Sequence, residues 1–222
     1  MAQTEQKRYP VIFLDIDGVM NLCECDKEYL EKQGYDYRDC VSPLAVERLA
    51  KICKETDAHV VLNGTVSIQL WNKDPRRTTD PDYCLPDGTP MLDAMREKGI
   101  IIDGVSFDRY KHSRKIEGAA VYLSEHPEVS HYIFIEDGKV IDNEDKEYVI
   151  YKYPELKEIV EVMDDSMHVD TNIYVEGGSV YGQPIGLSDE LKEKAIECLI
   201  EQRRLIIEPK WTRDEDDLEI ER

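Results

Sequence analysis

Short runs of apolar residues without polar alternation recur along this 222-residue chain, at residues 11–14, 59–62, 100–102 and 132–135. Runs of this length are typical of strands that are buried on both faces of a parallel sheet. Weaker patterns predict two further strands, at residues 147–151 and 169–175. The chain is therefore expected to contain a mostly parallel central sheet.

Helical spacing of apolar residues separates several of these runs. The clearest case follows Ser42, which can cap a helix that has Pro43 at its first position. Further helices are predicted at residues 90–98, 116–124, 154–163 and 188–204, the last with Ser188 as its cap. Alternating strands and helices predict parallel crossover units, and so a fold of the α/β class.

Four segments lie outside this alternation. Residues 1–8 are predicted to be a polar leader, and residues 211–222 an acidic tail, around a domain at 9–210. Insertions are predicted at about 22–40 and 68–112. The first insertion is polar and rich in tyrosine, and it fits a small cap or a surface loop equally well. The second contains a proline-rich irregular loop.

Three of the predicted strands end in polar groups. Asp15 and Asp17 follow the first strand, Asn63-Gly64-Thr65 the second, and Glu136-Asp137 the run at 132–135. The carboxyl ends of parallel strands meet at one edge of a sheet, where α/β proteins bind their ligands. A carboxylate cluster there suits a hard cation such as Mg²⁺. The alternative for Asp15 to Gly18 is a solvated turn.

The charge of the chain limits its partners. It has 28 basic and 48 acidic residues, a formal net charge of −20, which disfavours binding of long nucleic acid. A local basic patch could still bind one phosphate. No export signal and no apolar run of about 20 residues is present, so a cytoplasmic protein without a membrane span is expected. The six cysteines are then reduced thiols.

The stretch FLDIDGVMN, residues 13–21, resembles the first motif of the haloacid dehalogenase (HAD) superfamily of phosphohydrolases. More narrowly, it is similar to the small HAD domains found in Swiss Army Knife RNA repair proteins. The resemblance extends from about residue 9 to 200, and is weakest between 66 and 112. It implies a Rossmann-like three-layer sandwich with small cap-like insertions.

The resemblance also implies roles for the residues at the strand ends. Asp15 would be the nucleophile that forms an aspartyl-phosphate, and Asp17 the general acid and base. Mg²⁺ would be held by Asp15, by the backbone carbonyl of Asp17, and by an acid of the fourth motif. That acid is Asp137 in either of two alignments, with Glu136 or Asp142 in support.

Two further motifs bind the phosphate in proteins of this kind. The third motif aligns Lys115 with the phosphate-binding cation, and Arg114 is its substitute. In the second motif Asn63 replaces the usual Ser or Thr, with Gly64 and Thr65 beside it, and the usual Trp-Arg pair is missing. The Asn63 amide can still donate a hydrogen bond to phosphate.

The resemblance therefore implies a Mg²⁺-dependent phosphatase acting on a small phosphorylated substrate. A nucleotide, a nucleic-acid end and a phosphorylated metabolite all fit. The alternative is a catalytically weak HAD-like domain that binds a phosphorylated ligand or a protein partner. Asn63 favours that alternative, whereas the presence of both Asp15 and Asp17 counts against it. The oligomeric state is not predicted.

Overall fold

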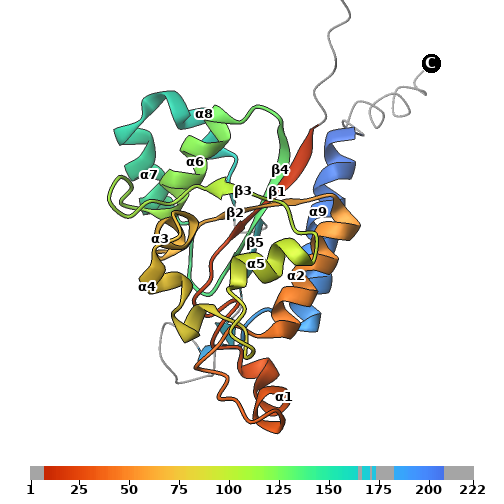
Figure 1. Cartoon of the computed structure of the whole chain (residues 1–222). Helices are drawn as coiled ribbons and strands as arrows, with labels where there is room; N and C mark the ends of the chain where they lie inside the picture. The colour runs from red at the N-terminus through yellow and green to blue at the C-terminus, as the bar shows by residue number, and fades with distance from the viewer. Residues whose placement is uncertain (1–7, 165–166, 171, 174–182, 208–222) are drawn as a thin grey trace, which may run out of the picture.

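A five-stranded parallel sheet stands at the centre of the computed structural model, which describes residues 8–164, 167–170, 172–173 and 183–207 (Figure 1). The spatial order of the strands is β3-β2-β1-β4-β5. The strands are β1 (Tyr9–Leu14), β2 (His59–Leu62), β3 (Ile102–Val105), β4 (Val129–Glu136) and β5 (His168–Asp170). The chain starts in the middle and winds outward in both directions, so β1 lies between β2 and β4. The sheet thus has the Rossmann-like α/β arrangement expected from the sequence.

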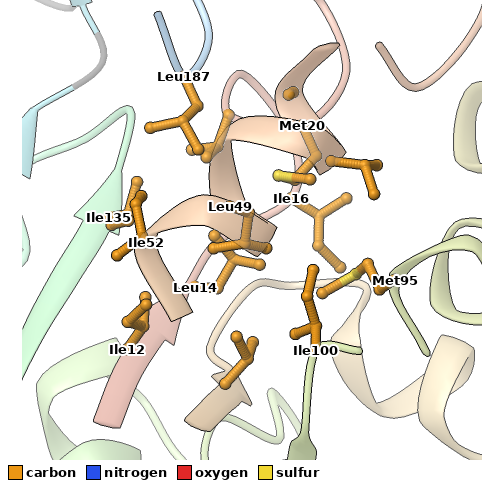
Figure 2. Close-up of a cluster of buried hydrophobic side chains, with 14 of the residues drawn as sticks. Ile12, Leu14, Ile16, Met20, Leu49, Ile52, Met95, Ile100, Ile135 and Leu187 are labelled. Atoms are coloured by element: carbon orange, nitrogen blue, oxygen red, sulfur yellow. The ribbon is translucent and has the colours of Figure 1, made fainter. Parts of the chain in front are cut away.

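One face of the sheet is covered by α2 (Pro43–Thr56), α5 (Met91–Glu97) and α9 (Asp189–Ile207) (Figure 1). Ser42 caps α2 by accepting a hydrogen bond from the Ala45 amide, with Pro43 at the first helical position. Figure 2 shows the core on this face, where Leu49 and Ile52 of α2 lie against Ile12 and Leu14 of β1. The predicted helices at 90–98 and 188–204 are confirmed.

The opposite face is covered by α6 (Lys115–Glu125), α7 (Asn143–Lys152), η3 (Pro154–Leu156) and α8 (Lys157–Glu161). Alternate residues of β1 supply the two cores: Ile12 and Leu14 face the first, and Val11 and Phe13 the second. All four are fully buried or nearly so. This explains why the first strand has no polar alternation. The predicted helices at 116–124 and 154–163 are confirmed.

The two predicted insertions carry short helices. Within 22–40 lie η1 (Glu24–Asp26) and α1 (Lys27–Lys32). Within 68–112 lie most of α3 (Ser67–Trp71), α4 (Pro75–Thr78) and η2 (Pro81–Tyr83), followed by α5 and β3. Because α5 and β3 belong to the sheet sandwich, only the part before α5 is added to the core fold. The outer residues 1–7 and 208–222 lie outside the described residues.

Two predicted strands are corrected by the structure. Residues 147–151 belong to α7, whose first turn is capped by Asp142, and in this helix only Val149 is buried. The strand predicted at 100–102 instead spans Ile102–Val105, because Ile100 closes the end of α5 through a hydrogen bond from its amide to the Met95 carbonyl. Apolar content alone does not separate a strand from a helix end.

The strand predicted at 169–175 is only partly described. Its beginning is β5, and β6 (Asn172–Ile173) pairs with β7 (Gln183–Pro184) as an antiparallel ribbon. Residues 171, 174 and 175 lie outside the described residues. Within the described ranges, no helix combines the length and apolar character needed to cross a membrane.

Candidate functional site

The site lies where β1, β2 and β4 end. Asp15 follows β1, and its amide donates a hydrogen bond to the Ile135 carbonyl of β4 at 3.0 Å. Asn63 follows β2, and its amide donates to the Leu14 carbonyl of β1 at 2.7 Å. The order of the strands reverses between β1 and β4, the position at which open α/β sheets bind ligands. The three predicted strand ends therefore meet, as the sequence indicated.

A buried ion cluster joins Asp15, Glu136 and Lys115. The Lys115 ammonium donates to Asp15 Oδ2 at 2.9 Å and to the two oxygens of Glu136 at 2.6 and 2.7 Å. The two carboxylate side chains are 4% and 3% exposed. Lys115 is the first residue of α6, so the helix start points its side chain across the sheet edge. The lysine predicted from the third motif therefore contacts the predicted nucleophile.

The electrostatics of this cluster are dominated by excess negative charge. Burial alone would lower the pKa of Lys115, but the charges of Asp15 and Glu136 and their hydrogen bonds raise it overall. Burial and the charge of Asp15 raise the pKa of Glu136 despite the opposing effect of Lys115. Burial and Asp15 also raise the pKa of Asp137. One ammonium does not balance three carboxylates, so the site favours an additional cation.

Two buried polar atoms at the site have no hydrogen-bond partner among the described residues: Asp15 Oδ1 and Asn63 Nδ2. The amide of Asn63 is held in place because its Oδ1 accepts a hydrogen bond from Ser106 Oγ at 2.9 Å. Leaving such atoms unpaired in a protein interior costs about 1–3 kcal/mol each. A buried acceptor and a buried donor that are both unpaired at this sheet edge are therefore expected to meet a ligand.

Two glycines make room for the carboxylates. A Cβ atom on Gly64 would lie 2.0 Å from Asp15 Oδ1, and one on Gly18 would lie 2.2 Å from Asp137 Oδ2. Gly18 also has a φ of +76°, which residues with side chains rarely adopt. Glycine at these two positions is therefore required by close approach, and not only by the turns that they form.

The donor set fits a hard divalent cation. One carboxylate oxygen from each of Asp15, Glu136 and Asp137 lies within 4.8 Å of the others. Oxygen ligands alone suit Mg²⁺ or Ca²⁺ better than the softer transition metals. Both oxygens of Glu136 accept hydrogen bonds from Lys115, whereas Asp15 Oδ1 is unpaired. Asp15 and Asp137 are thus the better placed ligands, and Glu136 holds the lysine.

Asp17 lies in a separate hydrogen-bond arrangement at the rim of the site. Its Oδ1 accepts hydrogen bonds from Asn21 Nδ2 and from the Tyr83 hydroxyl, both at 3.0 Å. Asn21 Oδ1 in turn accepts from the Gly18 amide at 3.0 Å. Asn21 stands in the FLDIDGVMN stretch, which could have indicated a role for it. Tyr83 comes from the proline-rich segment, and no sequence signal pointed to it.

Three predicted residues do not take part in the hydrogen bonds of this ion cluster. Arg114 forms an ion pair with Asp145 at 2.5 Å, and its guanidinium lies 5.6 Å from the centre of the Tyr148 ring. Asp142 caps α7 by accepting a hydrogen bond from the Asp145 amide at 2.7 Å. Thr65 is exposed, whereas the neighbouring Ser67 hydroxyl accepts a hydrogen bond from the Gly64 amide. Their roles in phosphate or metal binding stay predictions.

A Rossmann-like sheet with carboxylates at the reversal of strand order, faced by a helix-borne lysine, defines the HAD class of α/β proteins. The chain belongs to the family described as the HAD domain in Swiss Army Knife RNA repair proteins, whose model matches residues 11–155. The match covers all the predicted site residues and ends before α8. Searches of curated proteins and of solved structures found no match.

Proposed function

We propose that this protein is a Mg²⁺-dependent phosphatase that hydrolyses a small phosphate monoester through an aspartyl-phosphate on Asp15. The observation that carries the proposal is the state of the Asp15 carboxylate. It is buried, one oxygen is held by Lys115, and the other is unpaired, as is the side-chain amide nitrogen of Asn63 at the end of the neighbouring strand. A carboxylate that is held in one orientation and has one unpaired oxygen can act as a nucleophile toward the phosphorus of a phosphate group.

In the first step, a carboxylate oxygen of Asp15 bonds to phosphorus while the bond from phosphorus to the leaving oxygen breaks. Asp17 gives its proton to the leaving oxygen. In the second step, Asp17 takes a proton from a water molecule, whose oxygen attacks phosphorus and releases inorganic phosphate and the Asp15 carboxylate. The hydrogen bonds from Tyr83 and Asn21 hold Asp17 in one orientation for both transfers.

The remaining residues bind and neutralise the phosphate. Lys115 supplies a fixed positive charge, and Asn63 Nδ2 supplies a donor that is already desolvated. Asp15 and Asp137 would hold Mg²⁺, with Glu136 in support through Lys115. When bound, the metal ion offsets the charge of the phosphate and of the attacking carboxylate. Positioning and charge neutralisation supply most of the catalysis in phosphoryl transfer.

The second candidate function is binding without efficient turnover. It is favoured by Asn63, which takes the place of the Ser or Thr usual in the second motif. Because Asp17 is held by two hydrogen bonds, and a binding module has no use for an acid and base, we favour the phosphatase. The two functions differ in whether any phosphate is released.

The test is hydrolysis of p-nitrophenyl phosphate with Mg²⁺ and with EDTA, by the wild type, by Asp15→Asn and by Asp103→Asn. Asp103 is the matched control, since it pairs with His59 at 2.7 Å away from the site. We expect Mg²⁺-dependent turnover that Asp15→Asn abolishes and Asp103→Asn retains. Turnover in EDTA, or by Asp15→Asn, would sink the mechanism. No turnover of a panel of nucleotides and sugar phosphates would favour the binding module.

A further inference from the structure

A polar pocket of about 450 Å³ lies between α3, α4 and the segment that follows β3. Its lining includes Gln69 of α3, Arg76 and Arg77 of α4, and Arg109 and Tyr110 from the segment between β3 and α6. Three arginines around one pocket contrast with the net charge of −20 of the whole chain. This concentration of guanidinium groups is what an anionic ligand requires.

The arginines keep donors available for a ligand. Arg76 binds Asp74 through two side-chain hydrogen bonds, and Arg77 forms one ion pair with Asp80 at 3.4 Å. Arg109 donates to the Tyr110 hydroxyl at 3.0 Å. A guanidinium has five N–H donors, so these contacts use only a minority of them. The lining groups carry three positive charges against the two of Asp74 and Asp80, which leaves an excess of one.

Tyr83 contacts both Arg77, which lines the pocket, and Asp17, at the rim of the catalytic edge. The guanidinium of Arg77 lies 5.7 Å from the centre of the Tyr83 ring. On its other side, the Tyr83 hydroxyl donates to Asp17 Oδ1 at 3.0 Å. Because one ring contacts both Arg77 and Asp17, we infer that a small organic molecule can place one group at the catalytic edge and another among the arginines.

Gln69 adds an unpaired hydrogen-bond acceptor to the pocket. Its Oε1 is buried and has no hydrogen-bond partner among the described residues, and the residue lines the pocket. An amide oxygen in that state needs a donor, such as a hydroxyl group. The pocket thus offers guanidinium donors for an anion and one acceptor for a hydroxyl.

We propose that this arginine pocket binds a second phosphate group of the substrate, one that is not hydrolysed. The proposal rests on the proposed phosphatase function, because it places the first phosphate at Asp15. The substrate class is then a compact molecule with two phosphates, such as a nucleoside 3′,5′-bisphosphate or a hexose 1,6-bisphosphate. Arg76, Arg77 and Arg109 hold the second phosphate, and Gln69 accepts a hydrogen bond from the part that links the two.

The test compares each bisphosphate with its monophosphates in the wild type, in Arg76→Gln and in Arg109→Gln. Arg38→Gln is the matched control, because Arg38 binds Asp36 in the same geometry in which Arg76 binds Asp74, but outside the pocket. We expect the wild type to favour a bisphosphate by at least tenfold in kcat/KM. Each pocket variant should raise KM for it about tenfold. Turnover of p-nitrophenyl phosphate should stay within twofold.

A preference for either bisphosphate supports the pocket, and the preferred pair identifies the linking group. Equal kcat/KM for mono- and bisphosphates, or equal losses on both in the pocket variants, would overturn the proposal. Calorimetric binding of the bisphosphates to Asp15→Asn with Mg²⁺ separates the two proposals. Binding that weakens tenfold on adding Arg109→Gln supports the pocket even if the wild type releases no phosphate. If adding Arg109→Gln leaves the affinity for the bisphosphate unchanged, the pocket proposal is overturned.

Discussion

Two buried carboxylate clusters in this protein use similar groups for different purposes. In the first, both oxygens of Asp26 lie 2.8 Å from Arg48 Nη1, and Oδ2 also accepts a hydrogen bond from the Ser42 hydroxyl. Arg48 further donates to the Leu187 carbonyl and to Asp189. This cluster ties the segment that follows the first motif to α2 and to the start of α9, and its carboxylate is fully paired.

In the cluster around Asp15, by contrast, the carboxylates are incompletely paired. Asp15 and Glu136 share the ammonium of Lys115, Asp137 adds a third carboxylate within 4.8 Å, and Asp15 Oδ1 has no partner among the described residues. A buried charge is tolerated where partners satisfy it, as at Asp26, and is costly where they do not. Burial is thus common to both clusters, and incomplete pairing distinguishes the one at the sheet edge, where we propose the catalytic site.

The largest expected effect separates catalysis from stability at Asp15. Asp15→Asn should lower turnover of p-nitrophenyl phosphate about 10⁴-fold, the scale on which loss of a nucleophile acts. Its free energy of unfolding in EDTA should rise by about 1 kcal/mol, because one of three mutually repelling carboxylates is removed. Assays and urea unfolding on the same preparation measure both. A variant that is less stable than the wild type would contradict the comparison.

At Arg48 we expect a loss of stability without a loss of turnover. Arg48→Met should lower the free energy of unfolding by about 3 kcal/mol, because Asp26 is left buried without its cation. Turnover by the folded protein, measured well below the unfolding transition, should stay within twofold. Urea unfolding followed by tryptophan fluorescence gives the stability. A tenfold loss of turnover with unchanged stability would contradict this, because it would mean that Arg48 supports catalysis and not the fold.

Mg²⁺ should stabilise the folded protein through the carboxylates of the Asp15 cluster and not through Asp26. At a Mg²⁺ concentration 100-fold above Kd, the wild type is expected to gain about 2.7 kcal/mol. Asp137→Asn should lose most of this gain, whereas Asp26→Asn, although less stable, should keep it. Thermal unfolding with and without Mg²⁺ measures the shift. An equal shift in both variants would remove Asp137 from the metal site.

The smallest expected effect concerns Tyr83, which was not predicted from the sequence. Tyr83→Phe removes one hydrogen bond to Asp17 and should lower kcat/KM about fivefold for an alkyl phosphate, whose leaving oxygen needs a proton. For p-nitrophenyl phosphate, which leaves as a stable anion, the change should be under twofold. Equal losses on both substrates would show that Tyr83 supports the fold and not the proton transfer.

Much of the site follows from local sequence. The apolar runs at 11–14, 59–62 and 132–135 determine the buried strands, and the polar residues after them fall at one edge. The resemblance of FLDIDGVMN to the first HAD motif indicated Asp15 and Asp17, and alignment with the third motif indicated Lys115. These features are local, because strand and helix periods and capping depend on residues a few positions apart.

The tertiary structure decided which polar groups are paired. The sequence does not show that Asp26 is paired with Arg48, 22 residues away, or that Asp15 is only partly paired, by Lys115, 100 residues away. Likewise, only packing brings Tyr83 to Asp17, Ser106 to Asn63, and Arg109 to the arginines of α4. The physical reason is that pairing depends on how layers distant in sequence pack, and a hydrogen bond requires placement within a few tenths of an ångström.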